Sequence, residues 1–161
     1  MKVTIKIGVI ALNTESQLLL IREKYHDADG FKWNLIKGTY DNPNETLAEC
    51  AKRELQEEAG LNIDLSALRL KEVYNYGDDN NPKMLFIFYT LNIDAKTELA
   101  SSNDQKARGE NIVESKWFSL QSRLALTEKD CIANYVYLAL KNLNSNLENP
   151  NSSQVNFYKI I

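Results

Sequence analysis

A length of 161 residues, with 43% hydrophobic and 25% charged side chains, is typical of one globular domain with room for a core. The net charge of −3 gives no basic field to attract a nucleic-acid backbone, so we expect no duplex nucleic-acid partner. No apolar run approaches the roughly 20 residues that span a bilayer, and the alternating start does not resemble a signal peptide, so we expect a cytoplasmic protein with no membrane partner.

Cysteine and histidine chemistry has little support in this chain. Cys50 and Cys131 are too few and too isolated for a disulfide framework or a zinc site. The single histidine, His26, lies in a polar stretch typical of a loop. We expect two reduced, packed thiols and an exposed loop histidine.

The first predicted elements are strands at residues 3–11 and 17–22, joined by the turn-rich NTES into a hairpin. Further strand candidates follow in the segments WNLI, LRLKEVYNY, MLFIFYTLNI and IVESKWFSL. The stretch GDDNNP contains the Gly, Asn, Asp and Pro of a turn and separates the second of these from the third.

Two helices are predicted between these strands and after them. Residues 45–59 contain no Gly or Pro and are rich in helix formers, with Asn44 placed to cap the start and Gly60 to end the helix. Residues 128–142 present an apolar face at helical spacing. Strands before, between and after two helices predict an α/β or α+β layered domain over residues 1–142, with a mixed sheet covered on its faces.

The end of the chain, residues 143–161, is rich in Asn and Ser, and we expect a polar, flexible tail there. Its last residues, VNFYKII, are apolar again. They could dock on the domain or on a partner, and the sequence does not decide between the two.

The helix at 45–59 has two different sides. Ala48, Ala51, Leu55 and Ala59 gather on a core face, and Glu54, Glu57 and Glu58 fall within an arc of roughly 100° beside it. A solvated acidic face is the simplest interpretation. Two observations oppose it: the acids have no base at three or four residues apart from Lys52, with Arg53 expected to point elsewhere, and two of them occupy the last turn, where the helix dipole is unfavourable. A divalent cation, Mg²⁺ or Mn²⁺, would remove both objections.

Residues 38–61, GTYDNPNETLAECAKRELQEEAGL, resemble the Nudix box of the MutT/Nudix hydrolases, G-x5-E-x7-R-E-U-x-E-E-x-G-U with U aliphatic. The second part of the pattern matches without exception at Glu45, Arg53, Glu54, Leu55, Glu57, Glu58, Gly60 and Leu61. The first part departs from it, because six residues rather than five separate Gly38 from Glu45. We expect this extra residue to bulge the loop ahead of the helix.

The resemblance covers roughly residues 3–142, since strands before and after the box and the Trp-Phe pair near residue 117 stand where the family has comparable features. It implies the Nudix-type fold, an α/β/α sandwich with a mixed β-sheet. It also implies a pyrophosphohydrolase that uses Mg²⁺ or Mn²⁺ to cleave a diphosphate linkage in a small nucleotide-like substrate, such as a nucleoside triphosphate or a dinucleoside polyphosphate.

The resemblance assigns roles to particular residues. Glu54, Glu57 and Glu58 are expected to be metal ligands, with the general base left open, and Arg53 is expected to orient these acids. Gly38 could offer its carbonyl to the metal. A further acid ligand is expected from a later loop, where we favour Glu110 over Glu114, although either could be an ordinary surface residue.

The sequence gives weaker indications of which residues contact the substrate. Trp33 and Tyr74 could stack on a base, but aromatic residues on strands are more often part of the core. Lys37 belongs to WNLIKG, which resembles the L-P-K-G form found in dinucleoside polyphosphate hydrolases, and it could pair with an additional phosphate or be an ordinary loop lysine. Two further possibilities stay open: a homodimer, and a Nudix-like domain that binds a nucleotide or a partner without turnover.

Overall fold

The computed structural model describes residues 2–24, 30–100, 111–150 and 152–160. The strands are β1 (Thr4–Asn13), β2 (Leu18–Lys24), β3 (Phe31–Asn34), β4 (Ile36–Thr39), β5 (Arg69–Asp78), β6 (Asn81–Ile93), β7 (Ile112–Phe118) and β8 (Asn156–Lys159). The helices are α1 (Leu47–Ala59), α3 (Leu120–Leu124) and α4 (Asn134–Leu147), with short 3₁₀ turns at Leu65–Ala67 and Glu128–Asp130.

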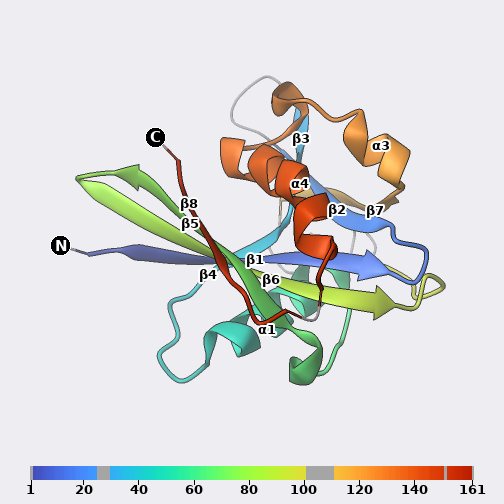
Figure 1. Cartoon of the computed structure of the whole chain (residues 1–161), viewed down its shortest axis with the longest axis horizontal. Coiled ribbons are helices and arrows are strands. Elements are labelled where there is room, and N and C mark those ends of the chain that lie inside the picture. Colours follow the sequence, from blue (N-terminus) through green and yellow to red (C-terminus); the bar gives the residue numbers. More distant parts are fainter. Residues whose placement is uncertain (1, 25–29, 101–110, 151, 161) are drawn as a thin grey trace.

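The eight described strands form one mixed sheet, shown in Figure 1. Its main order is β3-β2-β1-β6-β5-β8, with β4 paired to β1 and β7 paired to β2. β1 and β2 are antiparallel and meet only at the pair Leu12 and Leu18, which confirms the predicted hairpin. Beyond that pair the strands diverge, because β1 continues against β4 and β6 while β2 continues against β3 and β7.

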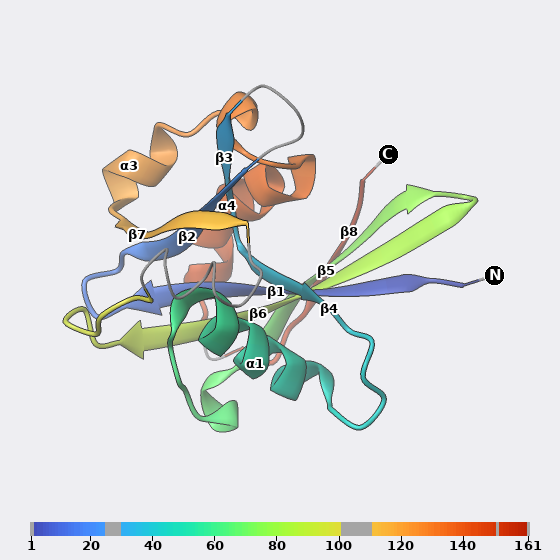
Figure 2. The same ribbon diagram turned by 180° about the vertical axis from the view of Figure 1, so that it is seen from behind.

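Helices cover both faces of the sheet, as Figures 1 and 2 show from opposite sides. β1 illustrates why, since its side chains alternate between the two faces. Ile7 and Val9 belong to the apolar cluster under α1, whereas Ile10 and Leu12 belong to the cluster under α4. The expected α/β/α sandwich with a mixed sheet is confirmed.

α1 begins two residues later than expected and is not capped by Asn44. Thr46 is the N-cap: its hydroxyl accepts a hydrogen bond from the Glu49 amide, and the Glu49 carboxylate accepts one from the Thr46 amide. This reciprocal pair satisfies two amides that the first turn of a helix leaves without partners. Gly60 ends α1 with φ +72°, as predicted.

The second predicted helix and the tail need correction. The chain forms a 3₁₀ turn at Glu128–Asp130, and α4 then runs from Asn134 to Leu147, past the expected boundary at 142. β8 pairs with β5 in parallel. The described part of residues 143–161 therefore completes a helix and adds an edge strand to the sheet, so the prediction of a flexible tail was wrong there.

A buried polar network ties these last elements to the sheet. The Glu72 carboxylate is fully buried and accepts hydrogen bonds of 2.8 Å from the hydroxyls of both Tyr74 and Tyr89. Asn142 and Asn146 of α4 donate to those two hydroxyls, at 3.1 and 3.0 Å. Asn156 of β8 then donates to Asn146 at 2.7 Å. The polar side chains of these asparagines therefore serve as hydrogen-bond partners in this network and do not simply face solvent.

Two smaller expectations have mixed outcomes. Cys50 and Cys131 are free, buried thiols, as predicted. His26 lies outside the described residues. Within the described ranges, no helix has the length and apolar character needed to cross a bilayer.

Candidate metal and phosphate site

The guanidinium of Arg53 binds three carboxylates at the start and along one edge of α1. Its Nη1 lies 2.7 Å from Glu54 Oε1 and 3.3 Å from Glu57 Oε2. Its other two nitrogens bind both oxygens of Glu45, at 2.8 and 3.2 Å. Two parallel bonds of this kind fix the orientation of both groups, and they lower the pKa of Glu45.

We expected Arg53 to point away from the acids, and this prediction was wrong, because its guanidinium binds Glu54 and Glu57. It stands four residues before Glu57, which is the spacing of a helical ion pair. Burial is the better argument against a solvated acidic face. Glu54 and Glu58 are only 7% and 3% exposed, so two of the three acids lie inside the protein.

Gly38 of β4 lies so close to the Glu54 side chain that a β-carbon at this position would overlap the carboxylate. A β-carbon at Gly38 would lie 2.0 Å from both Cδ and Oε1 of Glu54. Gly38 is paired with Ile7, whose side chain lies under α1, so this position of β4 faces the helix. The absent side chain is what lets a buried carboxylate rest against the strand.

The extra residue between Gly38 and Glu45 is taken up by a turn. The amides of Asn44 and Glu45 donate to the side-chain and backbone oxygens of Asn42, and the Tyr40 hydroxyl donates to the Glu45 carbonyl at 2.8 Å. The extra residue therefore lies in a hydrogen-bonded turn ahead of the helix. Glu45 still reaches Arg53, a contact that the spacing alone did not reveal.

Lys37 connects the acids to the opposite side of the sheet. Its backbone amide donates to Glu58 Oε1 at 3.2 Å. Its ammonium donates to the hydroxyl of Tyr135 on α4 and also lies 5.1 Å from the centre of that ring. Burial lowers the pKa of Lys37 and raises that of Tyr135. In the sequence, Tyr135 is one member of the apolar helical face of residues 128–142, and nothing there points to this contact.

The donor chemistry of this edge suits a hard divalent cation. Carboxylate and carbonyl oxygens are the ligands that Mg²⁺ and Mn²⁺ prefer. In these ion pairs one guanidinium is shared among three carboxylates, and Glu58 adds a fourth acid at the same edge. In this arrangement, with Arg53 bound to the acids, no three acidic, Cys or His groups of the described ranges already converge as metal ligands.

The other predicted site residues lie elsewhere. Glu110 falls outside the described residues, and Glu114 forms an ion pair with Arg22 at 3.2 Å. Trp33 is half-buried, with its ring edge-on to Phe118 at 4.6 Å. Tyr74 is 0% exposed, so its predicted contact with a substrate was wrong. Its ring stacks on Tyr158 inside the core.

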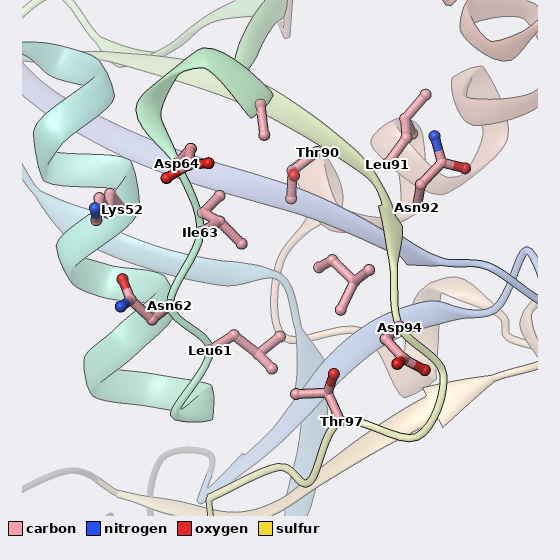
Figure 3. A pocket seen from close by; sticks show the side chains of 12 residues that line it. Lys52, Leu61, Asn62, Ile63, Asp64, Thr90, Leu91, Asn92, Asp94 and Thr97 are labelled. Carbon is pink, nitrogen blue, oxygen red and sulfur yellow. The ribbon is translucent and has the colours of Figure 1, made fainter.

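A cavity of about 370 Å³ lies away from these acids, between the segment that follows α1 and the end of β6. Figure 3 shows Lys52, Asp64 and Asp94 around it, with Leu61, Ile63 and Thr90 also in the lining. None of the predicted site residues within the described ranges lines this cavity. The acidic edge of α1, not this cavity, is therefore the candidate site.

The NUDIX domain family model matches residues 2–140, and those residues include every element of the acidic edge. The chain belongs to the NUDIX domain family. It is 38% identical over 72 residues to an uncharacterized Nudix hydrolase of Listeria monocytogenes. That match spans 44% of this chain and 42% of the relative, so it covers less than half of the length of either protein.

Solved structures with the same fold include a Nudix hydrolase from Nitrosomonas europaea, with a TM-score of 0.66, 18% identity and 90% of each chain covered. A MutT protein from Methanosarcina mazei gives a TM-score of 0.63 at 20% identity, covering 88% of this chain and 95% of that one. A bifunctional NMN adenylyltransferase/ADP ribose pyrophosphatase from Francisella tularensis, complexed with AMP and a manganese ion, gives 0.67 at 18% identity, covering 91% of this NUDIX chain and 42% of that one.

Proposed function

We propose that this chain is a Nudix hydrolase that uses Mg²⁺ or Mn²⁺ to cleave a diphosphate linkage in a small nucleotide-like substrate, such as a nucleoside triphosphate or a dinucleoside polyphosphate. One observation carries the proposal. In a chain of this family, the carboxylates of Glu54 and Glu58 are buried at the edge of α1, and β4 has a glycine where any side chain would displace Glu54. A purely solubilising acidic face would need neither feature.

The proposed ligands of the cation are Glu54, Glu57 and Glu58, with the carbonyl of Gly38 and Glu110 as further donors. When bound, such an ion neutralises phosphate oxygens and lowers the pKa of a water molecule. Because these acids come from a helix that packs on β4, their backbone positions are set before substrate arrives.

The remaining roles belong to neighbouring side chains. Arg53 holds Glu54 and Glu57 in position, and Glu45 in turn holds Arg53 through two hydrogen bonds. The ammonium of Lys37 faces the α4 side, where it can bind a phosphate of the substrate. We also propose that Trp33 contributes to the substrate surface. A cytoplasmic location, a homodimer and the absence of duplex nucleic-acid binding stay predictions.

A substrate screen tests this proposal. The purified protein is assayed with Mg²⁺ or Mn²⁺ against nucleoside triphosphates, dinucleoside polyphosphates, ADP-ribose and other nucleotide sugars. Turnover by the wild type is expected, with a loss of at least 100-fold in Glu57→Gln. Glu148→Gln, which alters an exposed acid at the end of α4, serves as the matched control and keeps wild-type rates. Silence across the whole panel would favour a domain that binds without turnover.

A further inference from the structure

Three lysines on neighbouring strands lie in a row on the face of the sheet opposite α1, and the backbone amide of Lys37 links this row to the acidic edge. Lys37 on β4 is opposite Gly8 of β1, and Lys6 is two residues before Gly8, so the two lysines share one face of the sheet. Lys83 on β6 is opposite Thr4, two residues before Lys6, and therefore lies on that face as well. Lys37 and Lys6 are diagonal neighbours on an antiparallel pair, which places such residues roughly 7–8 Å apart, and Lys83 is a diagonal neighbour of Lys6 on the parallel pair of β1 and β6.

The row lies on the α4 side of the sheet, and a pair of tyrosine rings that contact each other lies against its two end lysines. The Lys37 ammonium lies over the ring of Tyr135, and that of Lys83 lies 5.9 Å from the ring centre of Tyr76. The two tyrosine rings contact each other at 5.4 Å. Lys6, the middle lysine of the row, donates a hydrogen bond to the hydroxyl of Thr39 on β4.

Among the residues that the structure describes, no ion pair neutralises the charges in this row. Within the described ranges, none of the three lysines has a carboxylate oxygen within 4 Å, and their recorded partners are hydroxyls and aromatic rings. All three are half-buried. The pKa of Lys6 is lowered by burial, and then by repulsion from Lys37 and Lys83. Gathering like charges in a partly desolvated place is unfavourable unless an anion joins them.

Nearby acids do not remove this need for an anion. Glu54 and Asp41 attract Lys6, and Glu23 and Glu58 attract Lys37, but only through longer distances. Glu54 and Glu58 are also the proposed metal ligands, so their charge is committed to the cation when the site is loaded. The lysine row would then present positive charge to the part of a bound substrate that extends from the metal along the sheet.

We infer that Lys6, Lys37 and Lys83 form a polyphosphate track, so that the preferred substrate carries three or more phosphates in a chain rather than the two of a nucleotide sugar. This inference rests on the proposed function. Phosphates held by the metal would lie at the Lys37 end of the row, and the additional ones would lie over Lys6 and Lys83. Lys6 and Lys83 are then specificity residues that read the length of the phosphate chain.

Kinetics on substrates of different phosphate number test the track. The variants Lys6→Gln and Lys83→Gln are compared with wild type on ATP, diadenosine tetraphosphate and ADP-ribose. The ratio of kcat/KM for the longer chains to that for ADP-ribose is expected to fall at least tenfold in each variant. Lys141→Gln is the matched control, because Lys141 is an exposed lysine that lies over a tyrosine ring as Lys83 does. An unchanged ratio in both track variants would overturn the inference.

A binding measurement separates this inference from the proposed function. Titration calorimetry without divalent metal measures inorganic tripolyphosphate and pyrophosphate on the intact protein. Wild type is expected to bind tripolyphosphate at least tenfold more tightly, and each track variant to lose at least fivefold of that affinity. This outcome would support the track even if no nucleotide were turned over. Equal affinity of wild type and the track variants for tripolyphosphate would reject it, even if the enzyme were active.

Discussion

Gly38 and Glu54 occupy the same small volume between β4 and α1, because a β-carbon on Gly38 would lie 2.0 Å from the carboxylate carbon of Glu54. The glycine is thus required by the buried acid and not by a turn. Gly38→Ala must move Glu54, the strand or the helix. We expect kcat/KM to fall at least 100-fold and the free energy of unfolding to drop by about 1–3 kcal/mol from overpacking.

Gly8→Ala is the matched control for this change. It adds one carbon to the buried Gly8 of the neighbouring strand β1, where the new atom would meet Ile87 at 3.4 Å, which is ordinary contact. Thermal unfolding and steady-state kinetics on both variants give the comparison. If Gly8→Ala were as damaging as Gly38→Ala, the clash with Glu54 would not be the reason for the loss.

The pair of Glu45 and Arg53 predicts a coupling between two residues eight positions apart. Because a lysine cannot make two parallel hydrogen bonds, Arg53→Lys is expected to lower kcat/KM about 100-fold while keeping the positive charge. Glu45→Gln should lower it by a smaller factor, since Arg53 then loses one anchor. A double-mutant cycle is expected to give a coupling of about 1 kcal/mol in stability, allowing for partial solvent screening. Strictly additive effects would contradict the positioning role.

Glu72 predicts a pH dependence of stability that has no link to catalysis. Burial raises the pKa of Glu72 above its ordinary value of 4.5, although the hydrogen bonds from Tyr89 and Tyr74 oppose this. The folded protein therefore holds this proton more tightly than the unfolded chain. The cost of ionising Glu72 is absent below pH 4.5, grows as the pH rises above it and is complete above the raised pKa.

Glu72→Gln removes this titration. The stability of the variant relative to wild type is expected to rise as the pH increases from 4 to 8, as measured by urea unfolding at several pH values. Glu148→Gln, which alters an exposed acid, is the control and should show no such trend. A difference that stayed flat or declined over this range would mean that the pKa of Glu72 is not raised in the folded state.

The parts of the site that were predictable are those encoded by local spacing. One turn of a helix fixes where Glu54, Glu57 and Glu58 stand relative to each other, and the position of Gly60 after them marks the end of the helix. The partnership of Lys37 with Tyr135 joins residues 98 positions apart, so it depends on how α4 packs over the sheet. Spacing along the chain contains no information about that packing.

The errors have the same physical origin. Tyr74 alternates correctly for a strand, but alternation does not say which face is covered, and α4 with β8 buries this one. The polar asparagines of residues 142–156 led us to expect a solvent-exposed segment. Three of them, Asn142, Asn146 and Asn156, instead form hydrogen bonds in or next to the buried network around Glu72. Composition cannot distinguish an asparagine that meets water from one that meets a tyrosine hydroxyl.

Thr90 predicts a stabilising substitution in the cavity of Figure 3. Its side chain is 1% exposed, and its hydroxyl has no hydrogen-bond partner in the part of the chain that the structure describes. Because a buried hydroxyl without a partner costs about 1–3 kcal/mol, Thr90→Val, which keeps the shape, is expected to raise the free energy of unfolding by about 1 kcal/mol. Thr46→Val is the control and should be destabilising, since Thr46 caps α1. Urea unfolding measures both, and a Thr90→Val variant less stable than wild type would contradict a cost from the unpartnered hydroxyl.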